Sequence, residues 1–341
     1  MTPLPPVAVI ECTQTSPQTF QLSGGSSYDP DGVITGFTWD FGDGETAQGQ
    51  EMTYRYSEAG VFTIALTVTD DSGMKTTKYE HVTSYYEIEV PNDFATIQKA
   101  IEAATDGDVI CVSPGTYVEN IDFLGKAIVV KAQIVGSATI QAGAKEVSGS
   151  PLPAVRFHNE ENRNSILEGF IIQGPGPGTA TPHSGAGINI SGASPTIRNC
   201  TLQNCTAAEG GAVYAYESNC LVQDCKISNC TATINGGGVL MIGESVFPEL
   251  RDCAITSNRA NAGGGIYIFT THETRLAEDA TLPVISGCDI ASNYASGNPR
   301  LALKNKVGGG IEVGTGCRYE GEGNTFRSNT PCDVAFHDCN L

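Results

Sequence analysis

Aromatic and basic side chains in the carboxyl-terminal half of the chain are the residues most able to act on a sugar polymer. Tyr214 and Tyr267 each follow a glycine-rich triplet and one apolar residue, and we expect both rings to face outward and stack on sugar rings. Arg275, Lys304 and Lys306 lie in two stretches that interrupt a repeating sequence, where a cation could stabilise the enediolate of a lyase reaction. We predict the two tyrosines as carbohydrate-binding residues and the three cations as catalytic candidates.

Both predictions have a plain structural alternative. An outward tyrosine also occurs because aromatic residues favour strands. A lysine or arginine in a loop also occurs as an ordinary solvated charge.

Four aspartates in the amino-terminal quarter are the candidate metal ligands. Asp29 and Asp31 belong to a Tyr-Asp-Pro-Asp-Gly segment, and Asp40 and Asp43 to Trp-Asp-Phe-Gly-Asp-Gly. Carboxylates that converge from neighbouring turns suit calcium, which is the one cofactor that the sequence predicts. The alternative is that each carboxylate accepts hydrogen bonds from the backbone of its own turn.

The elements that must position Tyr214 and Tyr267 repeat along the chain. Glycine-rich triplets begin at positions 185, 210, 236, 263 and 308. A period of about 25 residues is too short for a propeller blade and fits one coil of three short strands. Equivalent residues then stack about 4.8 Å apart, one strand spacing. Two insertions lengthen the later coils, Thr271 to Thr281 and Tyr294 to Lys306, and we expect them to form neighbouring loops.

Alternation within each coil predicts which side chains point inward. The aliphatic residues form two ladders, Ile197, Val222, Leu250 and Ile285 in one and Leu202, Ile227, Ile255 and Ile290 in the other. Between them lies a ladder of cysteines, Cys200, Cys225, Cys253 and Cys288. A fourth ladder changes from cysteine to asparagine, whose amides can hydrogen-bond along the stack, Cys205, Cys230, Asn258, Asn293 and Asn329.

The stacked cysteines are interpreted as small buried apolar groups. Disulfides between these cysteines are the less favoured interpretation, because parallel side chains on neighbouring coils do not readily reach disulfide geometry. Cys332 and Cys339 near the carboxyl end are the pair to test for a disulfide.

Short runs with period-two alternation fill the first 86 residues. Pro6–Ile10 and Val61–Val68 are typical of half-buried strands, and Trp39–Gly44 leads an aromatic strand into a hairpin turn. Together with Ser27–Gly32 and Tyr56–Phe62, this pattern resembles the PKD domain, an immunoglobulin-like β-sandwich. The resemblance implies a spacer or a module that assists contact with a polymer, and we place it at residues 1–86.

The second domain is expected to open with an amphipathic helix. The helical spacing is carried by five apolar residues, Phe94, Ile97, Ala100, Ile101 and Ala104. A strand-like run, Val109–Val112, and a turn, Ser113–Tyr117, follow. This order is similar to the first turns of the pectin-lyase-like superfamily, in which such a helix covers the open end of the solenoid.

The resemblance implies that residues 87–341 form a right-handed, single-stranded parallel β-helix with an amino-terminal capping helix. The glycine triplets and Ser-Asn steps also resemble the repeats of polymorphic outer-membrane adhesins and other surface proteins. The whole chain is thus expected to be all-β, an immunoglobulin-like sandwich followed by a β-helix.

Charge and hydropathy argue against two classes of partner. The formal net charge is −19, from 19 Lys and Arg against 38 Asp and Glu, which opposes nucleic acid binding. The chain contains no run of about 18 or more apolar residues, the length that a membrane-spanning helix needs. Met1 stands directly before the first domain, as expected for an expression start on a trimmed mature protein. The domains themselves indicate a secreted or cell-surface location.

Three functions fit this architecture. The first is an extracellular adhesive or structural protein that binds a polysaccharide or cell-surface partner through the β-helix face. The second is a polysaccharide lyase or glycoside hydrolase, and the third is a subunit that self-associates into an extracellular filament or surface layer. A polygalacturonase-like site needs clustered aspartates, whereas Asp224, Asp252 and Asp289 stand alone on the coils. We therefore favour the first function.

Overall fold

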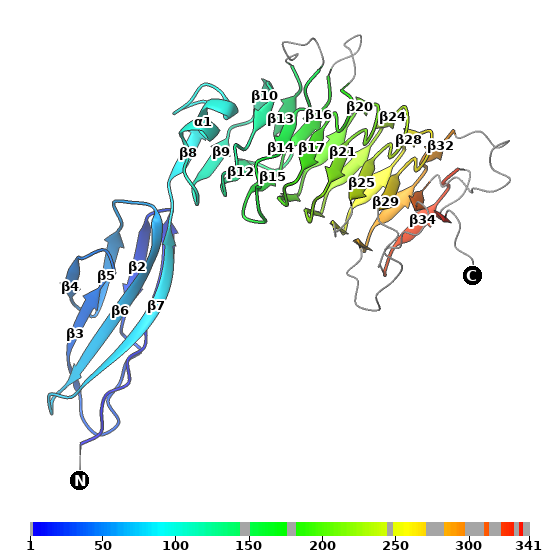
Figure 1. Ribbon diagram of the computed structural model, residues 1–341. Helices are drawn as coiled ribbons and strands as arrows, with labels where there is room; N and C mark the ends of the chain where they lie inside the picture. The colour runs from blue at the N-terminus through cyan, green and yellow to red at the C-terminus, as the bar shows by residue number, and fades with distance from the viewer. Residues whose placement is uncertain are drawn as a thin grey trace. The chain divides into compact units, whose positions relative to one another are not determined.

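Nearly all regular structure in this protein is β-strand. The computed structural model describes residues 3–143, 151–175, 182–243, 248–270, 283–296, 310–313, 322–330 and 334–336. They separate into two compact units, Met1–Glu87 and Ile88–Leu341. One helix, α1, is the exception among the described residues, which confirms the predicted all-β class (Figure 1).

Two antiparallel sheets form the amino-terminal unit. The first sheet has the order β1-β2-β5, with bounds Glu11–Ser16, Thr19–Ser23 and Glu51–Arg55. The second has the order β4-β3-β6-β7, with bounds Thr46–Gln48, Ile34–Asp40, Gly60–Asp70 and Lys75–Ser84. Trp39 and Tyr56 are fully buried in the core of this sandwich. Both satisfy their polar atoms, since Trp39 Nε1 donates to Gly49 O at 2.9 Å and the Tyr56 hydroxyl donates to Phe41 O at 2.8 Å.

The second unit is a coil of three long sheets, here named A, B and C. Sheet A contains β8 (Glu87–Val90), β9 (Val109–Val112), β12 (Val129–Ala132), β15 (Ile166–Glu168), β18 (Thr196–Arg198), β22 (Leu221–Gln223), β26 (Glu249–Arg251) and β30 (Val284–Ser286). Sheet B contains β10 (Gly115–Val118), β13 (Ala138–Gln141), β16 (Ile171–Gln173), β19 (Thr201–Gln203), β23 (Lys226–Ser228), β27 (Ala254–Thr256), β31 (Asp289–Ala291) and β34 (Thr325–Arg327).

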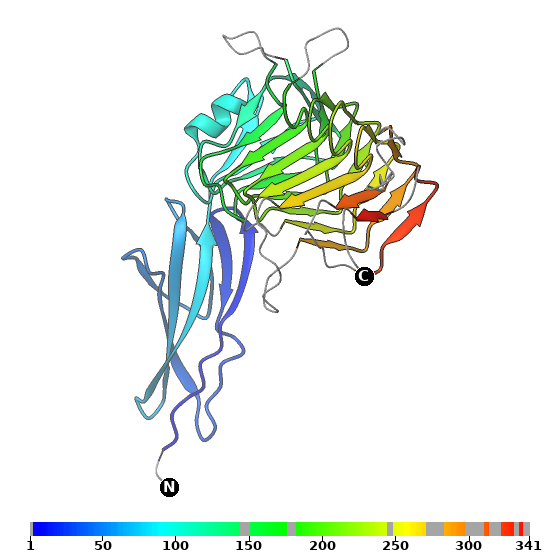
Figure 2. The same ribbon diagram turned by 45° about the vertical axis from the view of Figure 1, so that its right-hand side comes forward.

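Sheet C carries the face discussed below. It contains β11 (Ile121–Asp122), β14 (Val155–Phe157), β17 (Ile188–Ser191), β21 (Val213–Tyr216), β25 (Val239–Gly243), β29 (Ile266–Thr270), β33 (Ile311–Val313) and β35 (Val334–Phe336). Its strands pair in parallel from coil to coil. The strands therefore stack in chain order, as Figures 1 and 2 show.

A fourth, short sheet departs from the predicted three strands per coil. Sheet D contains β20 (Thr206–Ala207), β24 (Thr231–Ala232), β28 (Arg259–Ala260) and β32 (Tyr294–Ala295). The predicted start of the second insertion at Tyr294 is therefore wrong, because Tyr294 pairs with Arg259 of the preceding coil. The first insertion, Thr271 to Thr281, lies outside the described residues.

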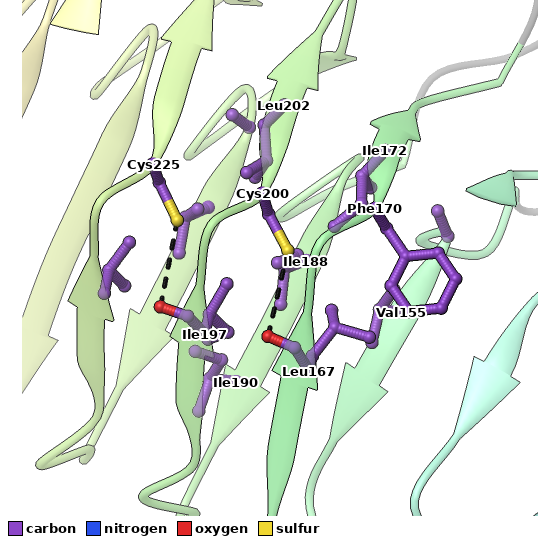
Figure 3. Close-up of a cluster of buried hydrophobic side chains, with 14 of the residues drawn as sticks. Val155, Leu167, Phe170, Ile172, Ile188, Ile190, Ile197, Cys200, Leu202 and Cys225 are labelled. Carbon is purple, nitrogen blue, oxygen red and sulfur yellow. Dashed lines mark hydrogen bonds between the residues drawn. The ribbon is translucent and has the colours of Figure 1, made fainter. Parts of the chain in front are cut away.

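The inward ladders are those that alternation predicts. Ile197, Val222, Leu250 and Ile285 are paired in register and buried, as are Leu202, Ile227, Ile255 and Ile290. None of the described cysteines forms a disulfide. Cys200 Sγ donates to Leu167 O and Cys225 Sγ to Ile197 O, each at 3.8 Å, so each thiol points toward the preceding coil (Figure 3). Cys332 and Cys339 lie outside the described residues.

Asparagine side chains replace cysteine in the later coils and hydrogen-bond along the stack. Asn258 Oδ1 accepts from the Cys230 N–H at 2.9 Å, and Asn258 Nδ2 donates to Ile227 O at 3.0 Å. The same two bonds recur at Asn293, which accepts from Asn258 N–H and donates to Ile255 O. This confirms the predicted asparagine ladder.

The helix α1 (Ile97–Ala103) packs its buried residues Ile97, Ala100 and Ile101 into the solenoid core. Thr96 is its N-cap and accepts from the Lys99 N–H at 3.2 Å. At the other end, Lys126 Nζ donates to the carbonyl oxygens of the last turn. The predicted capping helix is thereby confirmed. Nowhere in the described residues is there a helix long and apolar enough to cross a membrane.

Candidate functional site on the outward face of sheet C

The outward face of sheet C carries two columns of side chains, with one residue from each coil. From β11 to β29 the first column consists of Asp122, Arg156, Asn189, Tyr214, Leu240 and Tyr267, and Glu312 of β33 follows in register. The second consists of Ser191, Tyr216, Ile242 and Phe269. Successive members lie one strand spacing, about 4.8 Å, apart. The face is therefore polar toward the amino-terminal end of the solenoid and aromatic and aliphatic further along.

The glycine-rich turn before each strand covers the base of the first column. A Cβ added at Gly210 would lie 3.0 Å from Tyr214 Cβ, and one at Gly263 would lie 2.7 Å from Tyr267 Cβ. The φ angles of these glycines are 58° and 60°, a left-handed conformation that favours glycine. Because the turns pass so close, Tyr214 and Tyr267 are half-buried, and Leu240 between them is fully buried.

The second column is the exposed one. Tyr216 is 40% exposed and Phe269 is 36% exposed, with the half-buried Ile242 between them. The two rings lie two strand spacings apart, about 10 Å. A contiguous row of exposed apolar residues is a candidate binding surface. We call Tyr216, Ile242 and Phe269 the aromatic track.

Three side chains meet at the polar end of the face. Asp122 Oδ2 accepts hydrogen bonds from Arg156 Nε at 3.2 Å and Nη2 at 2.9 Å, and lies 2.8 Å from His158 Nε2. Its Oδ1 accepts from the Leu124 N–H at 3.0 Å. Burial raises the pKa of Asp122, but the hydrogen bonds from Leu124, His158 and Arg156 outweigh burial and hold that pKa below its usual value. Asp122 is ionised at neutral pH and balances the charge of Arg156.

A pocket of about 240 Å³ opens beside Arg156. Its lining includes Pro153, Arg156, His183, Ser184 and Asn189. Asn189 Nδ2 donates to Ser184 O at 3.2 Å, which holds the amide against the pocket wall. Asn189 lines the pocket and pairs in register with Tyr214, so the pocket adjoins the first column.

The surroundings of Tyr214 are acidic. Burial is the largest cause that raises the pKa of the Tyr214 hydroxyl, and the charge of Glu209 adds to it. Ser184 lines the pocket and pairs with Glu209 in a parallel bridge, so Glu209 lies beside the pocket. The Tyr214 hydroxyl therefore stays neutral and able to donate a hydrogen bond.

Comparison with known families identifies both units. The profile described as right-handed beta helix region matches residues 146–340, more than half of the chain. The chain belongs to this right-handed β-helix family. The PKD domain profile matches residues 3–84, so the amino-terminal unit is a PKD domain. The predicted PKD domain and the predicted right-handed β-helix are thereby confirmed.

Parts of this β-helix protein are similar to curated proteins. It is 37% identical over 71 residues to the pre-pro-metalloprotease PrtV of Vibrio cholerae serotype O1, covering 21% of this chain and 7% of that protein. It is 37% identical over 113 residues to a cell surface glycoprotein of Methanothermus fervidus, covering 33% and 16%. It is 31% identical over 191 residues to halomucin of Haloquadratum walsbyi, covering 53% and 2%. The chain spans less than a fifth of the length of each relative.

A solved pectin methylesterase from carrot is similar to the β-helix protein with a TM-score of 0.40 and 16% identity, covering 74% of this chain and 86% of that one. At that identity the likeness concerns the fold alone.

The β-helix places two of the predicted site residues on the outward face of sheet C. Tyr214 and Tyr267 lie there two coils apart. Sugar binding by these residues stays a prediction. The three catalytic candidates, Arg275, Lys304 and Lys306, lie outside the described residues, and their role also stays a prediction.

The four predicted calcium ligands lie in turns at opposite ends of β3. Asp40 Oδ1 accepts from the Gly42 N–H at 2.9 Å, and Asp43 accepts from the Glu45 N–H at 3.1 Å and from the Tyr54 hydroxyl at 2.6 Å. These bonds are those of the turn-capping alternative. The pair Asp40 and Asp43 cannot meet Asp29 and Asp31, because seven strand residues separate the two turns.

Asp29 has a different acidic neighbour. A side chain at Gly32 would collide with the carboxylates of both Asp29 and Asp71, so these two carboxylates approach the same turn. Asp31 accepts from the Leu4 N–H at 3.2 Å. Among the described residues, no group of three or more His, Cys, Asp or Glu side chains is arranged to hold a metal. Calcium binding stays a prediction.

Five residues of this face are not among the predicted site residues, Tyr216, Phe269, Asp122, Arg156 and His158. The signal for Tyr216 and Phe269 is present, because they stand two positions after Tyr214 and Tyr267 and so share their strand face. The polar residues belong to early coils that lack a glycine triplet, which leaves their register unmarked in the sequence.

Proposed function

We propose that this protein is an extracellular or cell-surface adhesive module that binds polysaccharide along the outward face of sheet C. The observation that carries the proposal is the aromatic track, in which Tyr216 and Phe269 are exposed in one register column. Aromatic rings remove the apolar faces of sugar rings from water at a low cost in side-chain entropy. A column with one member per coil suits a polymer that repeats along the solenoid.

Two further observations support an adhesive role at a surface. The similarity to a cell surface glycoprotein favours that location for this chain. The PKD domain is a separate compact unit, as a spacer would be.

The proposal is tested by retention of the whole chain on a panel of insoluble polysaccharides. We expect the wild type to be depleted from solution by at least one polymer without releasing new sugar ends. The double variant Tyr216→Ala with Phe269→Ala should weaken retention by about tenfold or more, since each ring contributes on the order of 1 kcal/mol.

The matched control is Tyr79→Ala, which removes a ring that is 62% exposed on β7 of the other unit. Retention of this control should equal that of the wild type. Absence of retention on every polymer, or equal retention by the double variant, would refute the proposal. Release of unsaturated sugars would instead show that the protein is a polysaccharide lyase.

A further inference from the structure

We propose that the pocket beside Arg156 holds the hydroxyl groups of an uncharged sugar, and that the polysaccharide bound by sheet C is therefore neutral. This inference rests on the proposed function and adds to it a second binding site and a class of ligand. It is carried by three observations: the position of the pocket, its hydrogen-bonding groups and its charge balance.

The position of the pocket fits a ligand that continues over the aromatic track. Arg156 and Asn189 line the pocket and also belong to the first column of sheet C. The next members of the columns after Asn189 and Ser191 are Tyr214 and Tyr216. At about 30 Å³ per water molecule, 240 Å³ holds about eight waters, a volume that suits one sugar ring. A sugar in the pocket would therefore place the following sugars on the track.

The hydrogen-bonding groups of the pocket match hydroxyls. Arg156 uses two of its five N–H donors for Asp122, and the others are oriented by this fixed pair. Asn189 adds an amide with both donor and acceptor atoms, and Ser184 adds a hydroxyl. A hydroxyl donates one hydrogen bond and accepts others, so a set of mixed donors and acceptors satisfies it.

The charge balance disfavours an acidic sugar. Arg156 is the one Lys or Arg side chain among the residues that line the pocket, and Asp122 already pairs with it. His158 is also directed to Asp122, and His183 is the other ionisable side chain in the lining. Glu209 lies beside the pocket and Tyr214, and the chain as a whole carries a formal charge of −19. A carboxylate here would lie near Asp122 and Glu209, and the described residues that line the pocket offer no unpaired arginine or lysine to bind it.

Matched polymers with and without carboxylates test this inference. Polygalacturonate, alginate and hyaluronan are each compared with their carboxyl-reduced forms, beside neutral glucan, galactan, mannan and xylan, by affinity electrophoresis of the whole chain. We expect binding to a neutral polymer, and at least tenfold weaker binding to the carboxylate form of any pair that binds. The affinity for the neutral polymer should change less than twofold between about 0.05 M and about 0.5 M NaCl, because no charge pair forms with the ligand.

Two pocket variants separate this site from the track. Arg156→Gln and Asn189→Ala should each weaken binding to the neutral polymer at least fivefold. Arg198→Gln should not, although it breaks an arginine–carboxylate pair of similar length, 2.8 Å to Glu168, on sheet A. Thermal unfolding of each variant verifies that it is folded.

The outcomes distinguish this inference from the proposed function. Stronger binding to the carboxylate forms that salt weakens, or full binding by folded Arg156→Gln and Asn189→Ala, would overturn the inference and leave polysaccharide binding intact. Absence of binding to every polymer would refute the proposed function, and the inference with it.

Discussion

Asn293 Oδ1 accepts two hydrogen bonds from Asn258, one from its backbone N–H at 2.9 Å and one from its Nδ2 at 3.1 Å. Asn293 Nδ2 in turn donates to Ile255 O at 2.8 Å. Both asparagines are 1% exposed, so water cannot replace these partners. The ladder therefore satisfies backbone groups that the coil leaves unpaired inside the solenoid.

We expect Asn293→Leu to lower the free energy of unfolding by about 3 kcal/mol or more, because the buried N–H of Asn258 and C=O of Ile255 would both lose partners. Urea unfolding of the whole chain measures the change. Gln203→Ala, which truncates an outward side chain of sheet B, should change stability by less than about 0.5 kcal/mol. Equal losses in the two variants would show that the ladder is not a stabilising element.

Gly264 packs against the backbone of the next coil. A Cβ at this position would lie 2.6 Å from the carbonyl carbon of Tyr294 and 2.7 Å from its nitrogen. Since backbone cannot move aside as a flexible side chain does, Gly264→Ala should cost about 2 to 3 kcal/mol of stability. Gly192→Ala is the control, because nothing lies within 4 Å of its Cβ and only the cost of its φ of 65° applies, about 1 kcal/mol. Calorimetric unfolding should separate the two variants, and coinciding curves would contradict the packing argument.

Lys126 closes the carboxyl end of α1. Its Nζ donates to the carbonyl oxygens of Ile101, Glu102 and Ala104 at 2.6, 2.8 and 2.7 Å. Lys126→Met should destabilise the amino-terminal end of the solenoid by about 2 kcal/mol, since hydrogen bonds to a charged group are lost. Hydrogen exchange at the α1 amides should accelerate. Lys99→Met, an exposed change on the same helix, should leave exchange unaltered, and a similar acceleration there would count against the capping role.

Asp122 should make the stability of the β-helix depend on pH in the acid range. Its pKa in the folded protein lies below that of the unfolded chain, about 3.9. The ionised carboxylate therefore stabilises the fold above about pH 4, and this contribution is lost as the pH falls through the folded pKa. Asp122→Asn should be less stable than the wild type at neutral pH and approach it in acid. Urea midpoints across this range measure the difference, which a pH-independent offset would contradict.

The buried thiols of the solenoid should react slowly with hydrophilic reagents. Seven of them are at most 2% exposed, Cys200, Cys205, Cys220, Cys225, Cys230, Cys253 and Cys288. Burial also raises the pKa of Cys220, which lowers its thiolate fraction. A brief pulse of iodoacetamide followed by peptide mass spectrometry should label the half-buried Cys12 and Cys111 before any of the seven. Rapid labelling of the ladder in the native state would contradict the burial described here.

The sequence predicts those parts of the fold that repeat once per coil. Ile197, Val222, Leu250 and Ile285 could be aligned because each coil supplies one member and the strands alternate. Sheet D could not be predicted in this way, since two-residue strands such as Thr206–Ala207 are too short to show alternation. Local capping also shortened the predicted helix, because Thr96 caps it and leaves Phe94 outside, packed against the core.

The site was predicted less completely than the fold. Outward direction was readable at Tyr214, but its burial depends on how closely the turn at Gly210 passes, which is a three-dimensional property. Asp122 and Arg156 are brought together by one full coil that has no glycine triplet to mark its register. Contacts between coils of unequal length are set by where each loop leaves the solenoid, and residue spacing alone does not report this.

Three successive coils each contribute one residue to the aromatic track, Tyr216, Ile242 and Phe269. Each coil contacts mainly the coils beside it, so one coil can be duplicated or deleted as a unit without rebuilding the remainder. Under the proposed function, every such event would lengthen or shorten the binding face by one step of about 4.8 Å. Avidity for a long polymer would then change with coil number, while the residues that make each contact stay the same.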